Sequence, residues 1–448
     1  MASALFPSDE SLAAMLTASL PACRDARARV HRCHVREVIT GRRGKVFALA
    51  EAEVVHLDGA AGATTRGVIL QRYPEGVDAV EEGRKVYRRL RRFARERGVR
   101  KSLSPWAGFI REERLLVLPF PFDYRLPALV DACDTAVVAA RFRAAGLART
   151  VRAIVPVRYV PEKRCQIRYE IEDAAGAPGA LFGKVVADES GARAVVSMRT
   201  LHAALRDSPV AGTPEPVAYL PEWRMVVQRA VPGRTLYDLQ REEAVDGVVY
   251  LRAGAALALV HRTPVPELPV HDTTHELALL ATAIGKHALA PSVEAEAGLL
   301  LAQLRTTATH LGTQPLVTSH RDFYDKQLLW GDRGLWLIDL DTLARAPQAL
   351  DAGNFLAHLR LRRRQGYLSP EQATQASGAF LYGFASGHRA DRAGLHWWTA
   401  ASLLRLATIY AVRPGWEHLG GQLVVDAAES LWRSGLAGTT ATVGRALA

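Results

Sequence analysis

The chain is poor in the residues that build disulfide frameworks or zinc sites. It has four cysteines in 448 residues, Cys23, Cys33, Cys133 and Cys165, and no two of them form a CxxC pair. Disulfide-dense scaffolds and zinc knuckles need closely spaced cysteines, so the sequence indicates neither. We therefore expect a protein of the reducing cytoplasm.

Membrane signals are missing as well. No apolar run approaches the length of a bilayer span, and the first residues, MASALFPSDESLAAML, carry acids where a signal peptide has a basic start. The composition is that of an ordinary globular protein, with 49% apolar and 23% charged residues. We expect two or three domains and no membrane contact.

Acidic residues are outnumbered by basic ones. Lys and Arg total 57 against 46 Asp and Glu, which gives a net charge of +11. Such an excess raises the question of a nucleic-acid partner. The densest basic runs, residues 88–100 and 360–364, are better explained as helices with a solvated basic face, and no nucleic-acid reading motif accompanies them. We expect no nucleic-acid partner.

The first half of the chain alternates groups of strands with single helices. Strand patterns cover residues 34–39, 46–55 and 67–72, before a helix at 78–97 and a strand at 114–120. The same order returns with strands at 151–160, 165–172 and 181–187, a helix at 194–206 and a strand at 224–229. Either this is a divergent internal repeat, or two unrelated small sheets share a common order.

The second half is mainly helical. Helical patterns cover residues 236–261, 275–287, 293–310 and 370 to the C-terminus, with one β-like stretch at 316–338. We therefore predict an α+β protein in four parts. These are an N-terminal helix or cap (1–30), an additional α+β domain (31–150), a small β-rich lobe (151–235) and a helical lobe (236–448) that contains a polar hairpin (316–341).

The hairpin holds the residues that indicate chemistry. Its loop reads SHRDFYDKQLL from Ser319, and its second strand ends in LWLIDLD at Asp341. Carboxylates such as Asp322 and Asp339 are costly to bury between apolar strands unless protons, cations or a metal compensate them. Phosphoryl transfer needs such a set, with one carboxylate to orient the attacking hydroxyl and further oxygens to hold Mg²⁺. The alternative is a polar hairpin with capping aspartates.

These residues resemble the aminoglycoside phosphotransferase family, a branch of the protein-kinase-like fold that includes small-molecule kinases for antibiotics, choline and sugars. The resemblance rests on H-x-D at His320, on an amide five residues after Asp322, on Ile-Asp ending at Asp339, and on ALDAGNF from Ala349. It implies a bilobal kinase-like fold with a β-rich N-lobe and a helical C-lobe, here preceded by the additional domain. ATP or GTP, Mg²⁺ and a small-molecule hydroxyl acceptor are implied with it.

The resemblance assigns roles within the hairpin. Asp322 is expected to be the catalytic base and His320 to shape the catalytic loop. Gln327 and Asp339 are expected to bind Mg²⁺, and Asp351 is expected to brace the loop. Gln327 stands where Asn is usual, as it does in maltokinase-like branches, which also carry an additional N-terminal domain. A sugar or aminosugar acceptor therefore ranks first, with an aminoglycoside-type antibiotic close behind.

Arg321 stands between His320 and Asp322, where Gly is frequent in the family. We predict that its side chain pairs with Asp351, because a basic residue among aspartates compensates their charge. The alternative is that Arg321 faces the donor phosphate. Asp325 and Asp341 are the candidate contacts to the acceptor, because an acceptor with several hydroxyls or amines needs acids near the reacting oxygen.

The second group of strands is expected to cover the nucleotide. Lys184 is the candidate residue for binding the nucleotide phosphates. In kinase-like folds such a Lys pairs with a Glu on the next helix, but here that helix contains no Glu, so Glu189 is considered as the partner. Lys163 and Arg164 lie in a turn that lacks the Gly-rich sequence of protein kinases and are assigned to the nucleotide. Gln228 is assigned to the hinge. The rival interpretation is a kinase-like binding or scaffold protein without catalysis. We expect a monomer or a homodimer.

Overall fold

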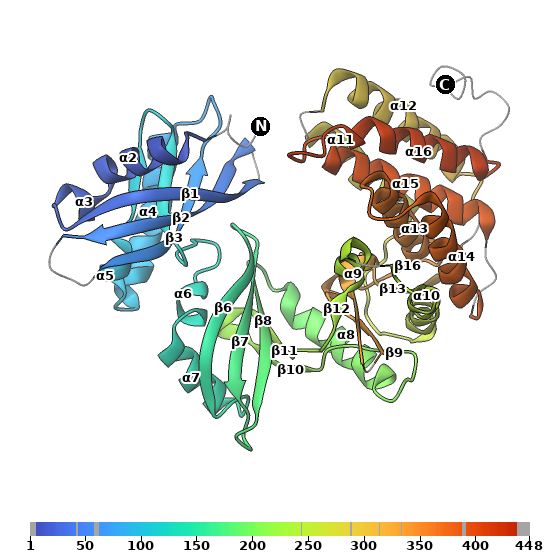
Figure 1. The fold of residues 1–448 in the computed structure, drawn as a ribbon, viewed down its shortest axis with the longest axis horizontal. Helices are drawn as coiled ribbons and strands as arrows, with labels where there is room; N and C mark the ends of the chain where they lie inside the picture. The colour runs from blue at the N-terminus through green and yellow to red at the C-terminus, as the bar shows by residue number, and fades with distance from the viewer. Residues whose placement is uncertain are drawn as a thin grey trace. The chain divides into compact units, whose positions relative to one another are not determined.

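The computed structural model describes residues 6–41, 44–57, 62–242, 244–286, 289–312, 314–332, 334–387 and 391–436 (Figure 1). They form two compact units. The first unit comprises Met1–Ala192 and Val217–Ala230, and the second comprises Arg193–Pro216 and Val231–Ala448. In the described part of the chain, no helix combines the length and the apolar character needed to cross a membrane.

The first unit begins with a five-stranded antiparallel sheet, which we call the first sheet. Its strands are β1 (Ala28–Thr40), β2 (Val46–His56), β3 (Ala63–Arg72), β4 (Gly108–Ile110) and β5 (Leu115–Pro119), in the order β1-β2-β3-β5-β4. The accompanying helices are α2 (Asp9–Ser19), α3 (Pro21–Arg24), α4 (Ala79–Glu96) and α5 (Arg100–Leu103).

Apolar cores cover both faces of the first sheet. Leu12 of α2 belongs to a core with Leu70 of β3 on one face, while Leu90 of α4 belongs to another core with Ile69 of β3. All five residues of β5 are buried, as expected for a strand covered on both sides. β5 and the second half of β3 are therefore covered on both faces.

A second five-stranded sheet, which we call the second sheet, completes the first unit. It contains β6 (Thr150–Val160), β7 (Arg164–Glu172), β8 (Pro178–Val186), β10 (Pro216–Leu220) and β11 (Met225–Arg229), in the order β10-β11-β8-β7-β6. Helices α6 (Leu129–Ala132) and α7 (Thr135–Ala144) precede it, and α8 (Ser190–Leu205), which belongs to the second unit from Arg193 on, follows β8.

Burial alternates along β7 and β8, so the second sheet has one core face and one more open face. The core face includes Tyr169, whose ring lies 4.9 Å from that of Phe142 in α7. The two sheets share one strand order: three antiparallel strands, a helix, and two more strands of which the last lies beside the third. The predicted similarity of order thus extends to topology. Packing nevertheless crosses residue 150, because α6 and α7 precede it but cover the second sheet.

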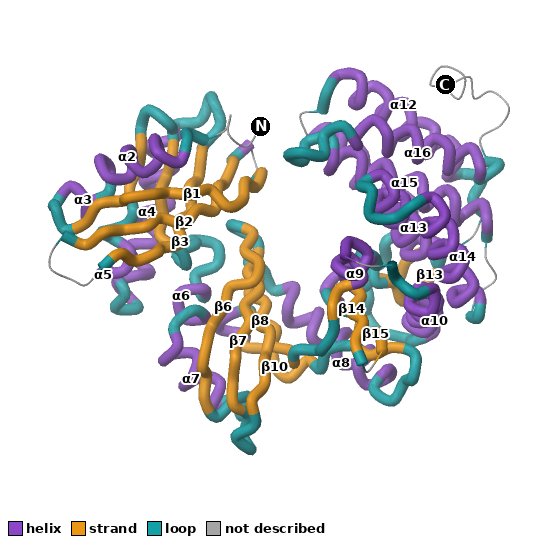
Figure 2. The backbone as a smooth tube through the Cα atoms, viewed as in Figure 1, coloured by secondary structure: helices purple, strands orange, loops and turns teal. Residues whose placement is uncertain are grey.

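The second unit is mainly helical, as the purple segments of Figure 2 show. Its helices are α9 (Leu236–Glu242), α10 (Gly247–Arg262), α11 (Thr273–Lys286), α12 (Pro291–Ala308), α13 (Ala349–Arg364), α14 (Pro370–Ala385), α15 (Arg392–Tyr410) and α16 (Leu419–Arg433). Short strands are β9 (Ala211–Gly212), β12 (Arg234–Thr235), β13 (Leu316–Ser319), β14 (Leu328–Gly331), β15 (Gly334–Leu337) and β16 (Ala344–Pro347).

Close helix packing builds the core of this unit. A Cβ at Gly254 of α10 would lie 2.0 Å from the carbonyl oxygen of Phe380 in α14, so only glycine allows this approach. Trp397 and Trp398 of α15 are fully buried. The predicted α+β class is confirmed. The single helix predicted at 236–261 is two helices, because the Asp246 side chain accepts the Val248 N–H and starts α10 anew.

Candidate active site

The polar loop lies between two short strand pairs. β13 pairs with β16, and β14 forms a hairpin with β15. The loop leaves β13 at Ser319 and enters β14 through the 3₁₀ turn Asp325–Gln327. Because both ends are fixed by strand pairing, the residues of the loop are held close to the segment that follows β15.

Asp351, in the first turn of α13, holds the loop by its backbone. Its Oδ2 accepts the His320 N–H and its Oδ1 accepts the Arg321 N–H, each at 2.7 Å. The carboxylate is fully buried. Hydrogen bonds to a buried carboxylate are among the stronger ones in proteins, and they fix Arg321 at its left-handed φ of 66°.

His320 connects the loop to the segment after β15. Its Nε2–H donates to the carbonyl oxygen of Ile338 at 2.9 Å, and Thr342 Oγ1 donates to the His320 carbonyl at 2.8 Å. The donor must be Nε2, because the Ile338 carbonyl only accepts. Both bonds hold the residues around Asp339 beside the loop.

Asp322 and Gln327 are in direct contact. Gln327 Nε2 donates to Asp322 Oδ2 at 3.2 Å. The backbone of Gln327 in turn accepts the Ile338 N–H at 3.0 Å, one residue before Asp339. Gln327 is buried, whereas Asp322 and Asp339 are half-buried. The loop thus brings Asp322 and Gln327 into contact, and the bond from Ile338 to the Gln327 backbone ties the segment before Asp339 to the loop.

These side chains fit a metal that completes its coordination with phosphate oxygens. No cluster of three His, Cys, Asp or Glu side chains suited to a metal occurs among the described residues. Gln327 and Asp339 offer one amide oxygen and one carboxylate. Mg²⁺ in nucleotide enzymes is held by one or two protein oxygens together with phosphates and water. The donor set therefore suits Mg²⁺ bound with a nucleotide.

The role predicted for Asp325 in binding the acceptor does not fit the structure. Arg362 of α13 donates from Nε to Asp325 Oδ2 at 2.6 Å and from Nη2 to Asp325 Oδ1 at 2.9 Å. Both side chains are only 1% exposed. Burial alone would lower the pKa of Arg362, but the charge of Asp325 outweighs it and raises that pKa. Asp325 is thus a buried structural partner. Asp341, in the 3₁₀ turn Leu340–Thr342, is half-buried.

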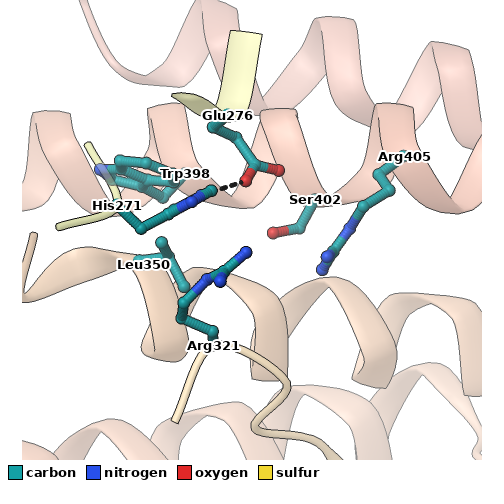
Figure 3. A pocket seen from close by; sticks show the side chains of 7 residues that line it. All are labelled: His271, Glu276, Arg321, Leu350, Trp398, Ser402 and Arg405. Atoms are coloured by element: carbon teal, nitrogen blue, oxygen red, sulfur yellow. Dashed lines mark hydrogen bonds and ion pairs between the residues drawn. The ribbon is translucent and has the colours of Figure 1, made fainter. Parts of the chain in front are cut away.

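The expected pairing of the Arg321 and Asp351 side chains is wrong. Asp351 binds the Arg321 backbone, and among the described residues the two side chains form no ion pair. Figure 3 shows the guanidinium pointing into a small recess between His271 and Arg405. The recess is lined by His271, Glu276, Arg321, Leu350, Trp398, Ser402 and Arg405. Its space of about 10 Å³ suits one water-sized group. Burial lowers the pKa of Arg321, with Glu276 opposing that shift.

Sequence reasoning missed the pair that forms the wall of this recess. His271 Nε2 and Glu276 Oε2 lie 2.9 Å apart, and both side chains are buried (Figure 3). Burial would raise the pKa of Glu276, but the hydrogen bond to His271 and the charges of Arg405 and Arg321 lower it below its usual value. His271 lies outside any helix or strand, so neither periodicity nor a motif marks it.

His358 of α13 is a second residue beside the loop that carries no assigned role. Its ring stacks on Tyr324 with centroids 4.1 Å apart. Burial, followed by the charges of Arg362, Arg405 and Lys326, lowers the pKa of His358 well below its usual value. This side chain is therefore a neutral packing element at neutral pH.

The candidate nucleotide residues lie in the first unit. Lys184 is half-buried on the more open face of β8, opposite Gln166 of β7 and Val226 of β11. Glu189, considered as its partner, forms an ion pair with Arg224 at 2.7 Å instead.

Two further candidates frame the second sheet. Lys163 lies in the turn between β6 and β7, and Arg164 begins β7. Gln228 lies in β11 opposite Phe182, two residues before the chain passes into the second unit after Ala230.

A model of the phosphotransferase enzyme family matches residues 168–396, which is just over half of the chain. The chain belongs to this family. The match contains the candidate catalytic loop and most of the second sheet. No curated protein matches the sequence.

Several solved structures resemble this phosphotransferase at low identity. Choline kinase from Cryptosporidium parvum is 12% identical, with a TM-score of 0.49, over 69% of this chain and 100% of that one. Macrolide 2′-phosphotransferase from Brachybacterium faecium is 16% identical, with a TM-score of 0.41, over 66% and 97%. A choline/ethanolamine kinase family protein from Mesorhizobium loti is 13% identical, with a TM-score of 0.45, over 63% and 91%. Such remote likenesses do not bear on the acceptor.

Membership settles the broad activity of the phosphotransferase. It is an enzyme with a protein-kinase-like fold, a small-molecule kinase that uses a nucleotide as phosphoryl donor. The predicted family is confirmed, and the enzyme is favoured over the scaffold interpretation. The family match begins at residue 168, so it leaves the first sheet unassigned.

Proposed function

We propose that this phosphotransferase transfers the γ-phosphoryl group of ATP or GTP to a hydroxyl of a sugar or aminosugar. The observation that carries the proposal is the loop itself. Asp322 is half-buried at its centre and contacts Gln327, while Asp351 and His320 hold the loop on both sides. A carboxylate fixed in this way can orient an attacking hydroxyl.

Asp322 acts as the base in this proposal. The acceptor oxygen attacks the γ-phosphorus, and the bond to the oxygen that bridges the β- and γ-phosphates breaks. That oxygen leaves with the electron pair as part of the nucleoside diphosphate, and the acceptor proton passes to Asp322. The hydrogen bond from Gln327 Nε2 holds Asp322 Oδ2 in place at 3.2 Å, which leaves Oδ1 for the acceptor hydroxyl.

Gln327 and Asp339 would hold Mg²⁺, which when bound neutralises charge on the phosphates. In this proposal Lys184, on the more open face of the second sheet, pairs with phosphate oxygens, and Lys163 and Arg164 add positive charge at the β6–β7 turn. Gln228 precedes the passage between units, where backbone groups would contact the base.

Several acidic side chains near the loop already have partners within the protein, which supports a sugar acceptor over a polycationic antibiotic. Asp325 is taken by Arg362, Glu276 by His271, and Asp351 by two backbone N–H groups. A polycation needs carboxylates that remain available to its amines. Asp341 stays the acidic residue that the sequence named for the acceptor, and an aminoglycoside-type antibiotic is the second choice.

A nucleotide-consumption assay with Mg²⁺ tests the proposal against sugars, aminosugars, aminoglycosides and other amino alcohols. We expect consumption that depends on a sugar or aminosugar and produces its phosphate ester. Turnover with aminoglycosides alone would contradict the acceptor class but keep the reaction. Nucleotide binding without turnover on any acceptor would contradict the reaction.

We also propose a cytoplasmic protein that acts as a monomer or a homodimer. All four cysteines are free and two of them, Cys33 and Cys165, are buried, which suits a reducing compartment. Light scattering of the purified chain measures the mass directly. A mass above that of a dimer would contradict the proposed oligomeric state.

A further inference from the structure

The two sheets of the first unit are joined at equivalent turns. Lys45 ends the β1–β2 turn of the first sheet, and Glu162 lies at the tip of the β6–β7 turn of the second sheet. Lys45 Nζ lies 2.7 Å from Glu162 Oε1, and the two side chains are only 15% and 10% exposed. An ion pair of such low exposure is screened far less than a surface pair.

Asp123 holds the same turn from a second direction. It lies in the segment that links the two sheets, and its Oδ2 accepts the Glu162 N–H at 2.7 Å. The same oxygen accepts the hydroxyl of Tyr159, at the end of β6, at 2.7 Å. Asp123 also accepts the Arg125 N–H at 2.8 Å. The carboxylate is buried, so its oxygens are committed to fixing backbone and side chain around the turn.

The backbone of Glu162 shows why such anchoring matters. Its φ is 60°, a left-handed conformation that favours glycine and that other residues adopt at a cost. In this turn the conformation is fixed from outside, by Asp123 at the backbone and by Lys45 at the side chain. Lys45 is itself enclosed, with its Nζ 5.9 Å from the Tyr73 ring centroid and 5.7 Å from that of Tyr124.

We propose that the first sheet positions the β6–β7 turn for the nucleotide. Lys45, Asp123 and Glu162, which we call the clasp, hold the turn in one shape and thereby present Lys163 and Arg164 to the phosphates. These three are positioning residues. The inference rests on the proposed nucleotide role of the turn. It gives a function to the domain that precedes the family match: this domain holds the turn in one conformation, where a glycine-rich loop would be flexible.

Nucleotide affinity and the exchange of the turn amides with solvent test the clasp together. Lys45→Met removes the cation but keeps an unbranched side chain, and Glu162→Gln removes the anion. Each is expected to raise the KM for the Mg²⁺-nucleotide about tenfold with a smaller change in kcat, because the competent turn is then populated only part of the time. Hydrogen exchange at the Glu162 amide is expected to quicken about tenfold. Lys45→Arg should restore part of both.

A matched control comes from an exposed pair on the same sheet. Arg36 and Glu51 join β1 and β2 at 2.6 Å but are 60% and 45% exposed. Arg36→Met should leave KM and the turn exchange within about twofold of the unaltered protein. The double variant with Lys45→Met and Glu162→Gln should cost no more than either single change, because both remove one interaction.

Unchanged KM and exchange in both Lys45→Met and Glu162→Gln, with the fold intact by thermal melting, would overturn the clasp. Absence of nucleotide binding by the unaltered protein would overturn only the proposed function. If the unaltered protein binds no nucleotide, exchange at Glu162 still reports whether Lys45 fixes the turn. If Lys163→Met and Arg164→Met weaken nucleotide binding while the clasp variants do not, the turn contacts the nucleotide without help from the first sheet and the clasp is wrong.

Discussion

Arg362 binds Asp325 through two hydrogen bonds of 2.6 and 2.9 Å, and both side chains are almost fully buried. This pair joins the last turn of α13 to the 3₁₀ turn Asp325–Gln327. A bidentate pair fixes two planar groups relative to each other. The turn that carries the proposed metal ligand is therefore anchored to the helix that also supplies Asp351.

Breaking this pair should cost stability and not acceptor affinity. Asp325→Asn leaves the Arg362 charge buried without its partner, so we expect the free energy of unfolding to fall by about 3 kcal/mol. The urea unfolding midpoint measures it. Asp332→Asn, at an exposed position in the turn after β14, is the control and should change stability by less than about 0.5 kcal/mol. A raised acceptor KM with unchanged stability would instead restore Asp325 to the acceptor site.

Gln327 should respond to substitution as a ligand and not as a packing residue. Gln327→Asn keeps an amide oxygen but withdraws it by one methylene, whereas Gln327→Leu removes it. We expect the Mg²⁺ concentration for half-maximal activity to rise in both, with about tenfold or more for Gln327→Leu. A magnesium titration at fixed nucleotide measures this. Equal magnesium dependence in all three proteins would contradict the metal role.

Asp351→Asn should loosen the catalytic loop. An asparagine side chain has one acceptor oxygen, so one of the N–H groups of His320 and Arg321 loses its partner. We expect the free energy of unfolding to fall by about 1–3 kcal/mol, and kcat to fall more than the nucleotide KM rises. Unfolding curves and steady-state kinetics measure the two effects. A variant with unaltered stability and kcat would show that the loop does not depend on Asp351.

His358 should make the protein sensitive to mild acid. Its pKa in the folded protein lies well below its usual value because of burial, so the unfolded chain binds a proton that the folded protein does not. The stability it contributes is present above pH about 6.5 and is lost as pH falls below that value, at about 1.4 kcal/mol per pH unit. Unfolding between pH 7.5 and 5.5 should show a shallower loss in His358→Phe, which keeps a ring against Tyr324. Parallel curves would contradict this role.

The candidate catalytic loop was predictable because its residues are close in the sequence. Asp322, Gln327 and Asp339 lie in one short segment of the chain, and it was the resemblance to the phosphotransferase family that marked them as one candidate site. The partners of that hairpin were not predictable. Arg362 lies 37 residues after Asp325, and helical periodicity marks Arg362 as part of a solvated basic run. In the structure Arg362 points into the core, where the buried carboxylate of Asp325 balances its charge.

The sheets were predictable for a similar reason, since alternation and turn residues are local signals. The helices that pack on each sheet were not predictable. The short helix α2 covers the first sheet although it precedes β1 in the chain. Likewise, α6 and α7 pack on the second sheet although they precede its first strand, which begins at Thr150. The clasp between Lys45 and Glu162 spans 117 residues, and neither of its turns carries a motif that indicates the other.

The most direct test of the account is the activity of Asp322→Ala beside that of Asp332→Ala. Acceptor-dependent consumption of nucleotide is measured with Mg²⁺ on the acceptor that the unaltered enzyme uses, together with nucleotide binding and thermal unfolding. We predict that Asp322→Ala folds and binds nucleotide but turns over at least about a hundredfold more slowly, whereas Asp332→Ala keeps its activity. An Asp322→Ala variant that retained a tenth of the activity would contradict the assignment of the base.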